Sequence, residues 1–142
     1  MIKGSAVFLT VLLLIELTLP NVQAKTEYPN QNQFPSVMEL ALLRELSIPI
    51  LETMQAHGDN QITIAERIEK IHWNETDDYH DITLRAIGFT GAHNPPYTLI
   101  RITFRTPNRY NPNKANSVIH YEHRKITPKE FDKLSKHTQY NP

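Results

Sequence analysis

An amphipathic stretch begins at Ser36. Ser36 and Glu39 have the spacing of a capping box, in which the serine oxygen accepts a backbone N–H and the glutamate reaches back to the cap. Apolar side chains then recur at helical spacing up to Gly58, a residue type common just beyond helix ends. Because Pro49 lies within the pattern and removes one helical hydrogen bond, we predict a helix that is kinked there or divided in two, and we favour the kinked form. The apolar positions are Leu40, Leu43, Ile50, Leu51 and Met54.

Alternation of apolar and polar residues predicts strands in the second half of the chain. Residues 97–106 alternate cleanly, with isoleucine and phenylalanine on one face and arginine and threonine on the other, which is the period of a half-buried strand. Residues 81–90 and 117–125 also read as strands. Residues 62–73 fit both a helix and a strand, and we predict a short helical turn that leads into a strand near 68–73.

Three independent start signals predict a short helix at the end of the chain. Thr127 is a favourable N-cap, Pro128 suits the first helical position, and Glu130 occupies the capping-box position. Ile126 and Phe131 are spaced as a hydrophobic staple. A long helix, a meander of strands and a short helix together indicate the α+β class. We therefore expect a kinked N-terminal helix packed on three or four antiparallel strands, with a short C-terminal helix, a layout that cystatin-like folds also have.

The beginning of the chain has the pattern of a secretory signal. Lys3 gives a positive start, an apolar block covers residues 6–17, and small residues lead up to a cleavage point at about Ala24. The apolar block is shorter than the roughly 20 residues that span a membrane. We expect a secreted protein with three parts: a signal peptide over 1–24, a flexible arm over 25–35 and a single domain over 36–142.

Composition limits the chemistry and the partners of the mature domain. The chain has no cysteine, so disulfides and thiol chemistry are excluded. Lysine and arginine number 15, as do aspartate and glutamate, and the leader contributes one charge of each sign. A neutral domain lacks the basic footprint that nucleic acids and anionic membranes select. We expect an unknown extracellular protein or ligand as partner, no nucleic acid, and no membrane after signal cleavage.

The most unusual segment connects two predicted strands and contains His93, Asn94, Pro95, Pro96 and Tyr97. Consecutive prolines end strand pairing, and the glycine just before can adopt backbone angles closed to other residues. A stiff hairpin connection is one interpretation. A recognition loop is the other, because the segment presents an imidazole, an amide and a phenol, and a stiff loop loses little entropy on binding. We take these five residues as the candidate binding site.

The pattern F-x-G-x-H-N-P-P-Y over 89–97, followed by an alternating I-x-I-T-F strand, resembles a family of small secreted proteins from Bacillus-type bacteria whose domain has no assigned function. The likeness extends from about Met38 to Ile126. Ala92 and Thr98 depart from the family pattern, which often has proline and glycine at these positions. The resemblance implies secretion and the extent of the domain, and it implies no activity.

Histidine chemistry is the main alternative. His120 and Glu122 alternate onto one face of a predicted strand, and His72 or His80 could join them from neighbouring strands. Zinc sites need three or four ligands in a defined geometry, and the sequence has no motif with that spacing. It also lacks the G-x-S-x-G nucleophile elbow. The sequence therefore predicts no catalytic set, no metal and no cofactor.

We expect a non-catalytic extracellular binding or interaction domain that uses the His93–Tyr97 loop. Two alternatives stay open. One is a histidine-based or metal-assisted hydrolase with His93, His120 and Glu122 as candidates, and convergence of these side chains in a pocket would favour it. The other is an inhibitor or accessory partner of another secreted protein.

Overall fold

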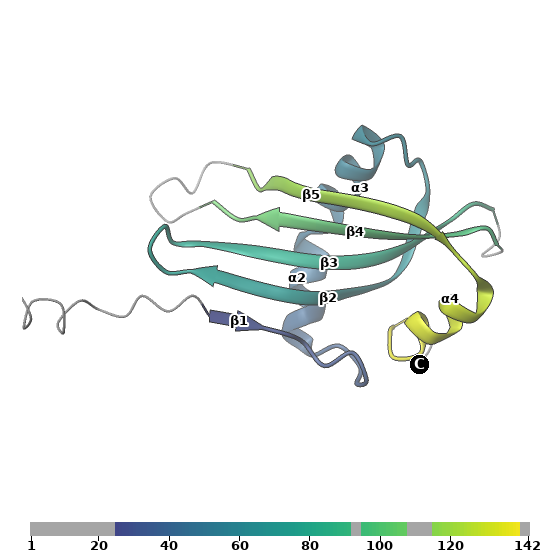
Figure 1. Cartoon of the computed structure of the whole chain (residues 1–142), viewed down its shortest axis with the longest axis horizontal. Helices are drawn as coiled ribbons and strands as arrows, with labels where there is room; N and C mark the ends of the chain where they lie inside the picture. Colours follow the sequence, from purple (N-terminus) through teal and green to yellow (C-terminus); the bar gives the residue numbers. More distant parts are fainter. Residues whose placement is uncertain (1–24, 92–94, 108–114, 140–142) are drawn as a thin grey trace, which may run out of the picture.

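The structure, a computed structural model, describes residues 25–91, 95–107 and 115–139. The predicted signal peptide lies outside these residues. The described chain has the predicted α+β class, with three helices and one antiparallel sheet (Figure 1). The elements in order are β1 (Lys25–Glu27), α2 (Val37–Glu45), α3 (Ser47–Ala56), β2 (Ile62–Asn74), β3 (Tyr79–Phe89), β4 (Tyr97–Arg105), β5 (Ser117–Ile126) and α4 (Pro128–Ser135). Within the described ranges we find no helix with the length and apolar content of a membrane span.

The sheet has five strands in the order β1-β2-β3-β4-β5, one more than the three or four predicted. The additional strand is β1, which lies in the arm expected to be flexible. It pairs with β2 from Lys25 opposite Trp73 to Glu27 opposite Ile71. A strand of three exposed polar residues has no alternating pattern, so the sequence provides no local signal for it.

β2 is one continuous strand, so the predicted helical turn before it does not form. Its register shifts between Ile64 and Arg67 and again between Ile68 and Lys70, and Ala65 in the first bulge has φ 58°. An extra residue in a bulge changes which face the following side chains occupy. Ile68 and Ile71 therefore pack in the same core cluster although they are three residues apart. This spacing resembles that of a helix, which explains the ambiguity of the sequence.

The N-terminal helical region consists of two helices, which corrects the predicted kinked helix. α2 ends at Glu45, α3 begins at Ser47, and Leu46 between them has φ −85° and ψ −3°. A proline ring clashes with the carbonyl four residues earlier, and for Pro49 that residue is Glu45. Pro49 itself lies in the first turn of α3, where a backbone N–H has no helical partner. The break therefore falls at the end of α2.

The helices pack on both faces of the sheet. The packing of α2 and α3 forms one core cluster, and the packing of α4 forms another. In Figure 1, α2 lies behind the sheet, α3 extends past its β5 edge, and α4 lies at its right-hand end. The first cluster lies between the sheet and α2 and α3, and comprises Leu43, Leu46, Ile50, Met54, Ile68, Ile82, Leu84, Ile100, Ile102 and Phe104. The second lies under α4 and comprises Ala65, Ile87, Phe89, Tyr97, Leu99, Ile126 and Phe131.

The predicted C-terminal helix is confirmed as α4. The Thr127 hydroxyl accepts the backbone N–H of Glu130 at 3.2 Å, and the Glu130 carboxylate accepts the N–H of Thr127 at 3.1 Å. Ile126 and Phe131, the predicted staple, both belong to the second core cluster. The capping box and the staple together fix the direction in which the chain leaves β5.

Candidate functional site

The predicted binding loop is described only in part. His93 and Asn94 lie outside the described residues, whereas Pro95 and Pro96 are exposed and are joined by a cis peptide bond. Tyr97 is 7% exposed, and its ring stacks on that of Phe131 with the centroids 4.2 Å apart. The Tyr97 ring therefore belongs to the core under α4, and the two prolines form the described surface of this segment.

His120 and Glu122 lie together on β5, with Nε2 and Oε2 3.6 Å apart. Glu122 also accepts a hydrogen bond of 2.9 Å from Arg101, and this bond lowers the pKa of the Glu122 carboxyl. Arg101 donates a further bond of 2.8 Å to Glu69 on β2. Glu122 is thus one member of a row of ion pairs that crosses the sheet.

The other two histidines considered from the sequence have separate neighbours. The Nδ1 of His72 lies 2.9 Å from the Thr26 hydroxyl of β1. The His80 ring stacks on that of Trp73, with centroids 6.1 Å apart. Among the residues that the structure describes, no three His, Asp or Glu side chains are grouped closely enough to hold a metal ion.

Tertiary folding produces a polar cluster that the sequence did not indicate. Asp59, just after α3, accepts hydrogen bonds on one oxygen, Oδ2, from the Tyr121 hydroxyl and, at 2.6 Å, from His123 Nδ1. His57 stacks on Tyr121 with the ring centroids 3.9 Å apart, and its Nδ1 lies 2.8 Å from the Thr53 carbonyl. The cluster joins the end of α3 to the edge strand β5. Tyr121 and His123 follow Asp59 by more than 60 residues, so no local spacing could reveal it.

The pKa of Tyr121 gives this cluster a measurable property. Burial, aided by the hydrogen bond to Asp59, raises the pKa of the Tyr121 phenol. The folded chain therefore keeps this proton at a pH where the unfolded chain releases it. The contribution to stability is complete below the unfolded value of about 10 and is lost as pH rises through the folded pKa.

We therefore expect the free energy of unfolding to decrease with pH above about pH 10, and to decrease less steeply in Tyr121→Phe. Urea unfolding followed by circular dichroism at several values between about pH 9 and pH 11 measures both slopes. Tyr28→Phe is the control, because Tyr28 is 71% exposed. Equal slopes in the wild-type protein and in Tyr121→Phe would contradict the assignment.

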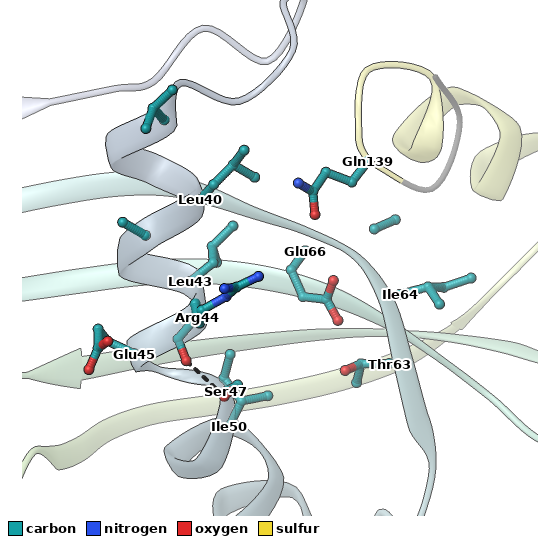
Figure 2. Close-up of a pocket in the computed structure, with 13 residues that line it drawn as sticks. Leu40, Leu43, Arg44, Glu45, Ser47, Ile50, Thr63, Ile64, Glu66 and Gln139 are labelled. Carbon is teal, nitrogen blue, oxygen red and sulfur yellow. Dashed lines mark hydrogen bonds between the residues drawn. The ribbon is translucent and has the colours of Figure 1, made fainter.

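An open cavity of about 860 Å³ lies between α2, the start of α3 and the first part of β2 (Figure 2). α2 and α3 contribute most of its apolar wall, and β2 contributes the residues beside its first bulge, where Ala65 has a positive φ. Val37 at the start of α2 is 82% exposed, so the cavity is open to solvent at that end. The apolar lining residues are Val37, Leu40, Ala41, Leu43, Ile50, Ile64 and Ala65.

Charged side chains from two elements reach into this cavity. Figure 2 shows Arg44 extending from α2 and Glu66 from β2 into the same space. The Gln139 amide, from the segment after α4, also lines this space. Within the described ranges, neither the Arg44 guanidinium nor the Glu66 carboxylate forms an ion pair or a side-chain hydrogen bond. Arg44 and Glu66 thus place two charges of opposite sign at the cavity, and Glu45 is a third charged residue of its lining.

A buried ion pair connects the elements that surround the cavity. The Arg67 side chain is 1% exposed and donates to Glu39 of α2 at 2.8 Å. It also donates to the carbonyl oxygens of Gln33 at 2.9 Å, His137 at 2.8 Å and Asn30 at 3.1 Å. Arg67 therefore links β2 to α2, to the segment before α2 and to the segment after α4. We call these interactions the Arg67 clamp.

The clamp changes the role of the predicted capping box at Ser36. The Ser36 hydroxyl accepts the backbone N–H of Glu39 at 3.1 Å, which is the predicted cap. The Glu39 carboxylate does not return to the cap, and instead binds Arg67 and the backbone N–H of Ile68, the latter at 2.9 Å. Glu39, which has the spacing of a capping box, thus forms a long-range contact with β2 instead.

Comparison with family models, with curated proteins and with solved structures gave no match to this chain. The assignment of a site therefore depends on the geometry of the described residues. The cavity is the feature in which a concave volume, an apolar wall and polar groups without a protein partner occur together, so we take it as the candidate functional site.

Proposed function

We propose that the mature chain is a non-catalytic extracellular binding domain whose ligand site is the cavity between α2 and β2. Secretion by way of the signal peptide over 1–24, and the resemblance to a Bacillus-type secreted family, are parts of the same proposal. The order of five strands with α2 and α3 on one face supports a cystatin-like layout for this domain. Such a layout describes the fold and does not by itself imply an activity.

The composition of the cavity is the observation that supports binding. Its volume of about 860 Å³ lies within the roughly 300–1,000 Å³ of pockets that accept small ligands. Such pockets combine apolar walls with a few polar groups that orient the ligand, and Arg44, Glu66 and Gln139 are suited to that role. The Arg67 clamp connects the elements around the cavity, so these elements lose little conformational entropy when a ligand binds.

The geometry supports a hydrolase less well. The His120–Glu122 pair is engaged with Arg101, and Asp59 is shared between Tyr121 and His123. None of these side chains lines the cavity. An inhibitor or accessory role would require a surface for another protein, and the His93–Tyr97 loop is the candidate for that surface.

Filling the cavity is expected to abolish binding of an apolar probe. Ala41 of α2 lines the cavity and is itself exposed, so Ala41→Trp adds an indole to the cavity without disturbing the core. We expect the neutral dye Nile red to bind the wild-type protein with increased fluorescence, and to bind Ala41→Trp at least about tenfold more weakly. A fluorescence titration measures both affinities.

Ala56→Trp is the matched control, because Ala56 is an exposed alanine at the end of α3 that does not line the cavity. This variant should bind the dye like the wild-type protein. Circular dichroism establishes that each variant is folded. Unchanged affinity in Ala41→Trp, or no dye binding by the folded wild-type protein, would overturn the proposed site.

A further inference from the structure

We infer that the cavity binds a short peptide with free ends and apolar side chains, whose carboxylate contacts Arg44 and whose ammonium contacts Glu66. This inference rests on the proposed function, because it names the ligand class of the same cavity. It depends on the signs and positions of the charges in the cavity and on the nature of the surrounding wall.

The two charged groups come from different elements and are not compensated within the protein. Arg44 belongs to the last turn of α2, and Glu66 lies in the first bulge of β2. Both side chains reach into the cavity in Figure 2, and within the described ranges neither forms an ion pair. A weak pairing between them in solution would compete little with a ligand, because exposed ion pairs contribute at most about 1 kcal/mol.

A ligand that carries both charges satisfies both groups at once. A fatty acid or another anion would pair with Arg44 but would cover the Glu66 carboxylate without giving it a partner. Covering a polar group without a hydrogen bond is unfavourable, and more so for a charged group. A carboxylate on Arg44 can form two parallel hydrogen bonds with the guanidinium, and an ammonium on Glu66 forms a charge-assisted bond.

The wall of the cavity favours a peptide with apolar side chains over a small polar zwitterion. Val37, Leu40 and Ala41 provide an apolar surface on α2 next to Arg44. The Gln139 amide, which has both a donor and an acceptor, can pair with a peptide group. The volume of about 860 Å³ exceeds the needs of one amino acid and suits a peptide of two or three residues.

The test uses the dipeptide Leu-Leu and two neutralised forms of it. N-acetyl-Leu-Leu lacks the ammonium, and Leu-Leu amide lacks the carboxylate. We expect the wild-type protein to bind Leu-Leu at least about tenfold more tightly than either neutralised form, as measured by isothermal titration calorimetry. Equal affinities for the three peptides would overturn the inference.

Two variants assign each charge to its partner. In Glu66→Gln, acetylation of the peptide should no longer weaken binding, and in Arg44→Gln, amidation should no longer weaken it. Glu52→Gln and Arg124→Gln are the controls, because both side chains are charged and exposed and neither lines the cavity. A penalty for acetylation that is the same in Glu66→Gln as in the wild-type protein would contradict the assignment.

The Nile red titration separates failure of this inference from failure of the proposed function. If the dye binds the wild-type protein and not Ala41→Trp, while the three peptides do not differ, the cavity is a binding site and the peptide inference is wrong. If neither the dye nor the peptides bind the folded wild-type protein, both proposals are wrong.

Discussion

Arg67→Met is expected to decrease the free energy of unfolding by about 3–5 kcal/mol. The Arg67 and Glu39 side chains are 1% and 6% exposed, so the Glu39 carboxylate would stay buried after its partner is removed. The carbonyl oxygens of Gln33 and His137 would also lose a donor. Leaving one member of a buried pair without compensation costs far more than the pair itself contributes. Urea unfolding followed by circular dichroism measures the change.

The double variant Arg67→Met with Glu39→Met provides the decisive comparison. Removing both charges also removes the uncompensated carboxylate, so the double variant should be more stable than Arg67→Met alone. Arg105→Met is the matched control, since Arg105 forms two hydrogen bonds to Asp81 of β3 but is 39% exposed. It should lose no more than about 1 kcal/mol. Equal losses of unfolding free energy in Arg67→Met and Arg105→Met would show that burial of the Arg67 clamp does not increase the cost of removing its arginine.

Met54→Ala is expected to decrease the free energy of unfolding by about 2–5 kcal/mol. Met54 is 0% exposed and lies in the core cluster between α3 and the sheet. Its removal would leave a cavity in this cluster, whose members Leu84 and Ile100 come from strands of the sheet and cannot easily move to fill it. The same unfolding measurement as for Arg67 determines the loss.

Ile48→Ala tests whether the effect of Met54→Ala comes from burial or from the helix itself. Ile48 lies on the same helix but is 61% exposed, so its truncation should change stability by no more than about 0.5 kcal/mol. If the two variants lost similar stability, α3 would not be docked through Met54 as described.

The helix prediction shows where sequence reasoning succeeds and where it stops. The sequence assigned Leu51 and Met54 to one apolar face, yet Leu51 is 44% exposed and Met54 is fully buried. Both residues belong to α3, whose buried side chains are Ile50, Thr53 and Met54. Leu51 lies beside this narrow stripe, and the sequence pattern alone does not give the width of the face that a helix buries.

The candidate site was less accessible to sequence reasoning than the helices. The sequence directed attention to the His93–Tyr97 loop, of which His93 and Asn94 lie outside the described residues and Tyr97 is a core residue. Arg44 and Glu66 belong to elements whose relative position is not encoded in local spacing. Only the packing of α2 beside the first bulge of β2 brings these two charges to the same cavity.

The sequence by itself determined the α+β class, the serine cap of α2, α4 with its capping box, and the alternating strand β4. Each of these depends on residues that are close in the chain, where capping and periodicity act directly. The tertiary structure alone decided the fifth strand, the bulges of β2, the Arg67 clamp and the cavity. These features join residues as far apart as Arg67 and His137, and they form only when burial of apolar surface brings distant segments together.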